Sequence, residues 1–253
     1  MDVKGKKAIV VGGASGMAKA SAELLTSKGA SVAILDRPQS AGAEVASAIG
    51  ASFHSCDVTD ADATEAAIDG AVDALGGALH ISVNTAGGGI ARRTLSKDGP
   101  HPLGEFRGII ELNLISSFNI ARLAAAHMAR NEPEDDERGV IISTASIAAF
   151  EGQIGQVAYT AAKAGIAGMA LTMARDLGGL GIRALAIAPS LFSTGITQGI
   201  PDEYALALTK DAAFPKRMGR PDEYAKLVLA IVENSMLNGQ CIRLDAGQRF
   251  APK

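Results

Sequence analysis

The chain of 253 residues has only two cysteines, no tryptophan and 4% aromatic residues. Cys56 and Cys241 lie far apart and form no C-x-x-C pair or His/Cys cluster, which argues against a disulfide framework and a metal site. We expect both to be buried free thiols, as in a reducing compartment. With few aromatic side chains, a hydrophobic content of 47% predicts a core of Ala, Val, Ile and Leu.

The chain also lacks a strong charge of either sign. Its formal net charge is -3, which argues against a nucleic-acid partner. Charged residues crowd positions 2–7 and no apolar stretch approaches the ~20 residues of a membrane span, so we expect neither a signal peptide nor a membrane partner. These features favour a cytoplasmic protein. The acidic run Glu134–Glu137 is expected to be a solvated loop.

Short apolar runs alternate with helical patterns along the whole chain, and no linker or repeat divides it. This alternation predicts one α/β domain over residues 1–253, a Rossmann-type doubly wound sheet of seven parallel strands. The expected strands are residues 6–11, 31–35, 51–56, 78–83, 139–144, 181–188 and 240–244, and the expected helices are residues 18–28, 61–75, 105–130, 156–177 and 222–233.

A glycine-rich turn follows the first expected strand and precedes the first helix. Glycines at such a turn let the backbone approach a pyrophosphate, whose charge the free N–H groups of the helix N-terminus stabilise. A tight turn alone can also require glycine, so the position between strand and helix is the informative part. The predicted dinucleotide contacts in this turn are Gly12, Ser15, Gly16 and Met17.

Small and polar residues end the next three expected strands, where open α/β sheets bind ligands. Asp36 lies twenty residues beyond Gly16, and its carboxylate can accept hydrogen bonds from the ribose hydroxyls of NAD and repel a 2′-phosphate. Arg37 is the opposing signal, and a surface turn beside Pro38 is the structural alternative for Asp36. Further cofactor contacts are predicted at Asp57 and Val58, near the adenine, and at Asn84, Thr85, Ala86 and Gly87.

Tyr159 and Lys163 are four residues apart, which places them on one face of a helix. An ammonium beside a phenol favours the phenolate and lowers the phenol pKa toward neutrality. Ser146, thirteen residues before Tyr159, can then orient a substrate oxygen while Tyr159 exchanges its proton. Asn113 can position a water that links Lys163 to solvent. The structural alternatives are a strand-end hydroxyl for Ser146 and a helix-interior amide for Asn113.

Together these motifs resemble the short-chain dehydrogenase/reductase family, over essentially the whole chain. The family's glycine motif corresponds to Val11-Gly12-x-x-x-Gly16-Met17-Ala18, with Val11 and Ala18 as departures. Thr85 departs from its Asn-Asn-Ala-Gly motif and Ser190 from its Pro-Gly pair. The resemblance implies that Asn113, Ser146, Tyr159 and Lys163 are catalytic, that Tyr159, Lys163, Pro189, Phe192 and Thr194 contact the cofactor, and that Ser146, Gln156 and Tyr159 bind substrate.

Within the family, the segment Ser143–Tyr159 and the motifs at Asn131, Ile187–Phe192, Phe214–Arg217 and Asn238–Asp245 resemble members that act on 3-hydroxyacyl-CoA. That resemblance implies reversible NAD-dependent oxidation to the 3-ketoacyl-CoA, a place in fatty acid metabolism and a homotetramer. The alternatives are a 3-oxoacyl reductase that uses NADPH, a hydroxysteroid or short-alcohol dehydrogenase, and a nucleotide-binding scaffold without turnover.

Two segments interrupt the alternation of strand and helix. Residues 87–104 contain Arg92, Arg93 and Lys97, which are candidates for the phosphates of coenzyme A or plain surface cations. His101 is expected to be a surface histidine. Residues 190–220 are expected to form a substrate loop beside the carboxyl edge of the sheet.

Overall fold

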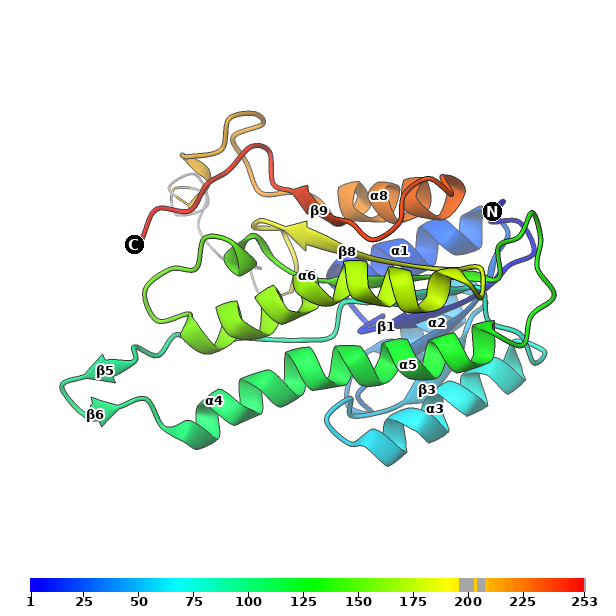
Figure 1. Cartoon of the computed structure of the whole chain (residues 1–253), viewed down its shortest axis with the longest axis horizontal. Helices are drawn as coiled ribbons and strands as arrows, with labels where there is room; N and C mark the ends of the chain where they lie inside the picture. The colour runs from blue at the N-terminus through cyan, green and yellow to red at the C-terminus, as the bar shows by residue number, and fades with distance from the viewer. Residues whose placement is uncertain (196–202, 204–207, 253) are drawn as a thin grey trace.

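A parallel sheet of seven strands forms the centre of the computed structural model, which describes residues 1–195, 203 and 208–252 (Figure 1). All its strand pairs are parallel, which confirms the predicted doubly wound α/β architecture. In spatial order the strands are β3 (Ser52–Ser55), β2 (Ser31–Asp36), β1 (Lys7–Val11), β4 (Ile81–Asn84), β7 (Gly139–Thr144), β8 (Ile182–Pro189) and β9 (Cys241–Leu244).

Helices cover both faces of this sheet (Figure 1). The core of one face contains buried side chains of α1 (Gly16–Ser27), α2 (Gly42–Ile49) and α8 (Pro221–Glu233). The core of the other face contains those of α3 (Ala61–Ala74), α5 (Ser116–Met128) and α6 (Val157–Gly178). Aliphatic side chains dominate both cores, as the composition predicts. Helix α2 is not among the helices expected from sequence, because it is only eight residues long and has no side-chain N-cap.

The strand register brings the carboxyl ends of the central strands to one edge. Val11 pairs with Leu35 of β2 and with Asn84 of β4, while Thr144 of β7 pairs with Ile187 of β8. Residues that follow these strands therefore converge, although they are far apart in the sequence. This edge is where doubly wound sheets bind their ligands.

The long helix expected over residues 105–130 is a continuous helical segment with a local change of winding. Helix α4 (Leu103–Ile110) passes into a π-helical turn, Glu111–Ile115, and then into α5. Contrary to the expectation from sequence, Leu103–Met128 is long and apolar enough to cross a membrane by length and composition. Within its most apolar window 56% is buried inside the protein, as in the core helix of a globular domain.

A small antiparallel hairpin, β5 (Leu95–Ser96) with β6 (Gly99–Pro100), lies in the segment between β4 and α4 and projects from one end of the molecule (Figure 1). Within residues 190–220, positions 196–202 and 204–207 lie outside the described residues. The described part of that loop includes Phe192, which is buried against Tyr224 of α8 with the rings edge to face.

Two further sequence expectations are corrected by the fold. Cys56 is buried, whereas Cys241 is only half-buried because β9 is the edge strand of the sheet. The acidic run is not wholly solvated either. Glu137 is largely buried and forms ion pairs with Arg183 at 2.7 Å and with the N-terminal amine at 3.0 Å. Its charge compensates the buried guanidinium, and loss of Glu137 would leave that guanidinium unpaired inside the protein.

Candidate active site

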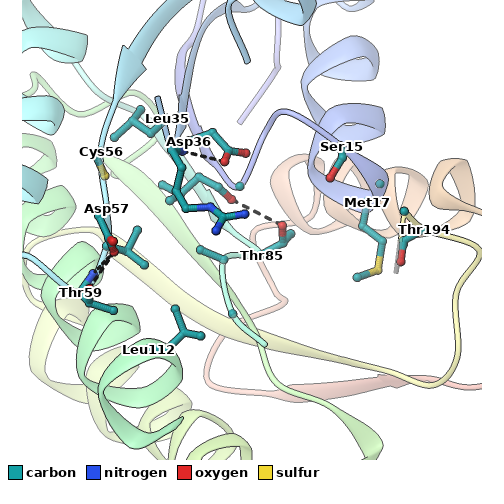
Figure 2. A pocket seen from close by; sticks show the side chains of 18 of the residues that line it. Ser15, Met17, Leu35, Asp36, Cys56, Asp57, Thr59, Thr85, Leu112 and Thr194 are labelled. Carbon is teal, nitrogen blue, oxygen red and sulfur yellow. Dashed lines mark hydrogen bonds between the residues drawn. The ribbon is translucent and has the colours of Figure 1, made fainter. Parts of the chain in front are cut away.

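A cavity of about 620 Å³ opens at the carboxyl edge of the sheet, where β1, β2, β3 and β4 end (Figure 2). Most of the predicted dinucleotide contacts line it. From the predicted set these are Gly12, Ser15, Gly16, Met17, Asp36, Asp57, Val58, Thr85, Ala86, Gly87 and Thr194. Also lining it, without having been predicted as contacts, are Val11, Leu35, Arg37, Cys56, Thr59, Gly108, Leu112 and Gly195.

The glycine turn, which leads into the N-terminus of α1, packs closely against the segment that follows β4. Gly12 has a φ of 82°, and a Cβ there would lie 2.9 Å from the Thr85 hydroxyl. Helix α1 begins at Gly16, and the side chain of its N-cap residue Ser15 forms no capping hydrogen bond. Its first turn also has no acidic residue. An anion such as a pyrophosphate therefore fits at this helix N-terminus, where the helix dipole stabilises negative charge.

Asp36 ends β2 and lines the same cavity. Its Oδ2 accepts a hydrogen bond from the Ala14 N–H at 2.9 Å, and its Oδ1 accepts one from the Arg37 N–H at 2.7 Å. These bonds orient the carboxylate toward the turn that follows β1. Each carboxylate oxygen retains further acceptor capacity, so Asp36 can still receive ribose hydroxyl groups.

Asp57 follows β3, the strand next to β2, and also lines the cavity. Its Oδ1 accepts hydrogen bonds from the Thr59 N–H at 3.0 Å and the Thr59 hydroxyl at 2.8 Å, and these bonds lower the pKa of the carboxyl. Figure 2 shows this pair at the edge of the cavity. The Asp-x-Thr spacing is typical of a local turn, so this spacing is the sequence signal by which Thr59 could have been predicted.

Asn84 is one of five predicted cofactor contacts that do not line this cavity. It is 3% exposed and does not line the cavity. Its Nδ2 donates to the Ser117 hydroxyl at 3.1 Å, and its Oδ1 accepts from the Ala86 N–H at 3.0 Å. The side chain therefore fixes the end of β4 against α5. The buried residues Pro189 and Phe192 do not line the cavity either. The same holds for Tyr159 and Lys163, which were also predicted to contact the cofactor.

Tyr159 and Lys163 lie in the first two turns of α6. The Lys163 ammonium is 5.6 Å from the centre of the Tyr159 ring, which confirms the shared helix face. Lys163 is 3% exposed and donates a hydrogen bond to the Thr144 carbonyl at 2.8 Å. Burial disfavours the charged ammonium and lowers the pKa of Lys163 to about 8.

The pKa of Tyr159 differs from the sequence expectation. Burial of the phenol raises this pKa, and the hydrogen bond with Ser146 only partly offsets the rise. The expectation that Lys163 by itself lowers the Tyr159 pKa was therefore wrong for the free protein. The physical reason is that the ring is desolvated and the ammonium donates to Thr144 instead of to the phenol.

Ser146 and Gln156 flank the segment before α6. Ser146 follows β7, is 9% exposed, and its Oγ accepts from the Ala148 N–H at 3.1 Å. The hydroxyl proton of Ser146 is thus left for another acceptor. Gln156 is the N-cap residue of α6, and its Oε1 accepts from the Gln153 N–H at 3.0 Å. This bond uses the amide oxygen of Gln156 within the protein and leaves its NH₂ group for a ligand.

Asn113 lies in the π-helical turn and is fully buried. Its Nδ2 donates to the carbonyls of Gly88 at 2.8 Å and Ile109 at 2.9 Å, and its Oδ1 accepts from the Gly88 N–H at 3.2 Å. Such turns are frequent at functional sites. Asn113 therefore fixes the glycine-rich backbone that runs from the cavity toward α6.

Gly87 connects the cavity to the tetrad. It lines the cavity, and a Cβ at this position would lie 2.5 Å from the Asn113 Oδ1 and 3.3 Å from the Lys163 Nζ. A Cβ at Gly89 would lie 3.1 Å from the Tyr159 ring. Asn113, Tyr159 and Lys163 are thus packed directly behind the backbone that forms the end of the cavity.

The buried ammonium predicts a pH-dependent stability. Its folded pKa of about 8 lies below the ordinary 10.5, a difference worth about 3 kcal/mol against folding at neutral pH. The unfolded chain binds more protons between pH 8 and 10.5, so this penalty disappears as pH rises through that range. We expect Lys163→Met to stabilise the free protein at pH 7 and to lose this advantage by pH 10.5 in urea unfolding. Lys226→Met, at an exposed lysine, is the control. If the free energy of unfolding of Lys163→Met differed from that of the parent by the same amount at every pH, the burial penalty would be contradicted.

The comparisons with known proteins agree with this geometry. The profile of the family described as short chain dehydrogenase matches residues 6–205. The chain is 47% identical to "3-hydroxyacyl-CoA dehydrogenase type-2" of Bos taurus over 99% of its length and 97% of the relative, and 45% identical to the Homo sapiens protein of that name with the same coverage. A solved structure titled 3-hydroxyacyl-CoA dehydrogenase type-2 from Mycobacterium avium superimposes with a TM-score of 0.94 at 43% identity, covering 98% of both chains.

The chain therefore belongs to the short chain dehydrogenase family. It is an oxidoreductase that acts on CH–OH groups with a nicotinamide cofactor. The cavity fits such a cofactor by its own features, the glycine turn that admits a pyrophosphate and the carboxylate at the end of β2.

Proposed function

We propose that this protein is an NAD-dependent dehydrogenase that interconverts a 3-hydroxyacyl-CoA and the 3-ketoacyl-CoA, with Asn113, Ser146, Tyr159 and Lys163 as its catalytic residues. The observation that supports it most is the position of Gly87, which lines the dinucleotide cavity and packs against both Asn113 and Lys163. The substrate class comes from the relatives named 3-hydroxyacyl-CoA dehydrogenase type-2.

In this proposal each of the four residues has a separate role in the proton transfer. Bound NAD supplies the acceptor for the hydride that leaves the substrate carbon. Tyr159 takes the proton of the substrate hydroxyl, and Ser146 donates a hydrogen bond that orients the same oxygen. Lys163, held by the Thr144 carbonyl, stabilises the phenolate by its charge. Asn113 fixes the backbone at Gly88 beside the reacting groups.

A panel of substrates tests the function. NADH formation at 340 nm should be fastest with 3-hydroxyacyl-CoAs and slower with steroids and short alcohols. A dominant steroid or short-alcohol activity would replace the substrate class but leave the dehydrogenase assignment. No turnover with any of these substrates, combined with tight dinucleotide binding, would favour a nucleotide-binding scaffold without catalytic activity.

The carboxylate at the end of β2 predicts a preference for NAD. Asp36 lines the cavity and would repel a 2′-phosphate, so kcat/KM should be higher with NAD than with NADP. Asp36→Ala should reduce this ratio by roughly tenfold or more, since one charge repulsion is removed. Arg37→Ala is the matched control, and it should raise the ratio if Arg37 is the group that receives a phosphate. A parent enzyme that prefers NADP would favour the 3-oxoacyl reductase instead.

The hairpin segment offers a place for the phosphates of coenzyme A. A hollow of about 470 Å³ lies between this segment and the start of α6, with Arg92 and Arg93 in its wall together with Val157 and Thr160 of α6. Tyr159 lies between these two α6 residues in sequence. Arg92 also forms an exposed ion pair with Glu105 at 3.2 Å, and Lys97 lies near the hairpin tip, between β5 and β6.

Replacing both arginines, Arg92→Ala with Arg93→Ala, should raise KM for a 3-hydroxyacyl-CoA by roughly tenfold and leave KM for a short alcohol unchanged, because charge-assisted contacts to phosphate are lost. Arg130→Ala, at an exposed arginine beyond α5, is the control. An equal change for both substrates would contradict a coenzyme A contact.

The homotetramer and the cytoplasmic location stay predictions.

A further inference from the structure

Tyr224 of α8 has a hydroxyl group that the proposed chemistry does not use. Its side chain is completely buried, which is costly for a phenol unless the hydroxyl has a partner. The partner is the Thr144 hydroxyl at 2.7 Å. Thr144 is also the residue whose carbonyl accepts the hydrogen bond of Lys163 at 2.8 Å. A single residue at the end of β7 therefore links Tyr224 to the buried ammonium.

The direction of these hydrogen bonds follows from the number of protons. The Thr144 hydroxyl has one proton and lies 2.6 Å from the main-chain carbonyl oxygen of Asn84, which can only accept. Thr144 therefore donates to Asn84, and Tyr224 must donate to Thr144. The Tyr224 hydroxyl is the first donor of a chain that fixes the carboxyl ends of both β7 and β4.

This series of hydrogen bonds continues toward Asn113. The side-chain amide of Asn84 donates to the Ser117 hydroxyl at 3.1 Å, and that hydroxyl donates to the main-chain carbonyl of Asn113 at 2.6 Å. Every side chain in this series is at most 6% exposed. Water cannot replace a missing partner easily at such sites, so each bond restricts the position of the next group.

We infer that Tyr224 is a positioning residue for proton transfer: its hydroxyl fixes Thr144, whose carbonyl holds Lys163 beside Tyr159. The inference rests on the proposed function for its effect on turnover, while the position of Lys163 can be measured without substrate or cofactor. Because the Tyr224 ring also packs edge to face on Phe192, the same residue connects the loop after β8 to this site.

Tyr224→Phe is the direct test, since it removes the hydroxyl and keeps the ring. In alcohol oxidation kcat/KM rises with pH as the tyrosine loses its proton. With Lys163 held less firmly, the phenolate is less stabilised. The midpoint of this rise should move to higher pH by roughly half a unit or more, with kcat at neutral pH reduced about fivefold, the equivalent of about one buried hydrogen bond.

A second measurement does not depend on activity. In protein with ¹³C,¹⁵N-labelled lysine, the Lys163 resonance is the one absent from Lys163→Met, and its titration midpoint in the parent should lie near pH 8. In Tyr224→Phe that midpoint should fall, because a loosened carbonyl favours the ammonium less. The titratable neighbour of this ammonium is Tyr159, whose ring centre lies 5.6 Å away, and a second sample with ¹³C-labelled tyrosine follows it.

Two further variants separate positioning from general stability. Thr144→Val removes the contact with Tyr224 and also the bond to the Asn84 main-chain carbonyl, so it should move both midpoints at least as far as Tyr224→Phe. Adding Tyr224→Phe to Thr144→Val should change little, because their shared contact is already lost. Ser21→Ala removes another buried hydroxyl, in α1, and should lower Tm without moving either midpoint.

The inference would be overturned if Tyr224→Phe lowered Tm and left both the Lys163 midpoint and the pH profile at parent values. If the parent showed no turnover but the Lys163 midpoint moved as expected, the proposed function would fail and the positioning role would stand.

Discussion

Replacing Tyr159 by phenylalanine is expected to reduce kcat for alcohol oxidation at least ~10²-fold, the usual scale for loss of a general acid–base group. Tyr159→Phe removes the hydroxyl but keeps the ring that packs against Gly89. Dinucleotide affinity, measured by NADH fluorescence, should stay within a factor of about two, because the cavity wall is unchanged. Parent-like turnover in Tyr159→Phe would exclude this phenol as the proton acceptor.

The pKa of Tyr159 gives this prediction its pH dependence. Burial raises the phenol pKa in the free protein, so proton loss must be favoured by the charges that surround it during turnover. The rate of alcohol oxidation should therefore increase with pH, since the phenolate is the base. The small residual activity of Tyr159→Phe should not show that rise, which a pH series of kcat/KM will measure.

The second large effect is expected for Gly87→Ala, which should lower kcat/KM at least ~10²-fold. The added Cβ would lie 2.5 Å from the Asn113 Oδ1 and 3.3 Å from the Lys163 Nζ, and both groups are buried and fixed by other hydrogen bonds. Gly87 also has a φ of 156°, at the edge of the region that favours glycine. A shift of about 1 Å in catalytic groups is enough for a loss of that size.

The adjacent Gly88 offers a matched control. A Cβ there would meet only the Leu112 side chain, at an ordinary contact distance of 3.5 Å. Gly88→Ala should therefore affect kcat/KM far less than Gly87→Ala, although both add one methyl group to the same loop. Equal effects would show that the loop needs general flexibility and that the contact with Asn113 and Lys163 is not decisive.

Local spacing explains why so much of the fold could be predicted. The first strand, the glycine turn and α1 follow each other within Lys7–Ser27, so hydrophobic period and glycine position are sufficient to identify them. Residues four apart share a helix face by helix geometry alone, which fixes Tyr159 beside Lys163. The missed elements, α2 and the hairpin at Leu95–Pro100, are short and have weak patterns.

The sequence by itself therefore determined the class of fold, the dinucleotide turn and the pairing of Tyr159 with Lys163, because these depend on residues close together in the chain. Only the tertiary structure decided that Asn84 points into the protein, that Lys163 donates to Thr144, and that burial raises the Tyr159 pKa. It also placed Tyr224, from a distant helix, behind this site. Hydrogen-bond partners and desolvation depend on groups that meet only when the strands and helices pack, and no spacing along the chain encodes them.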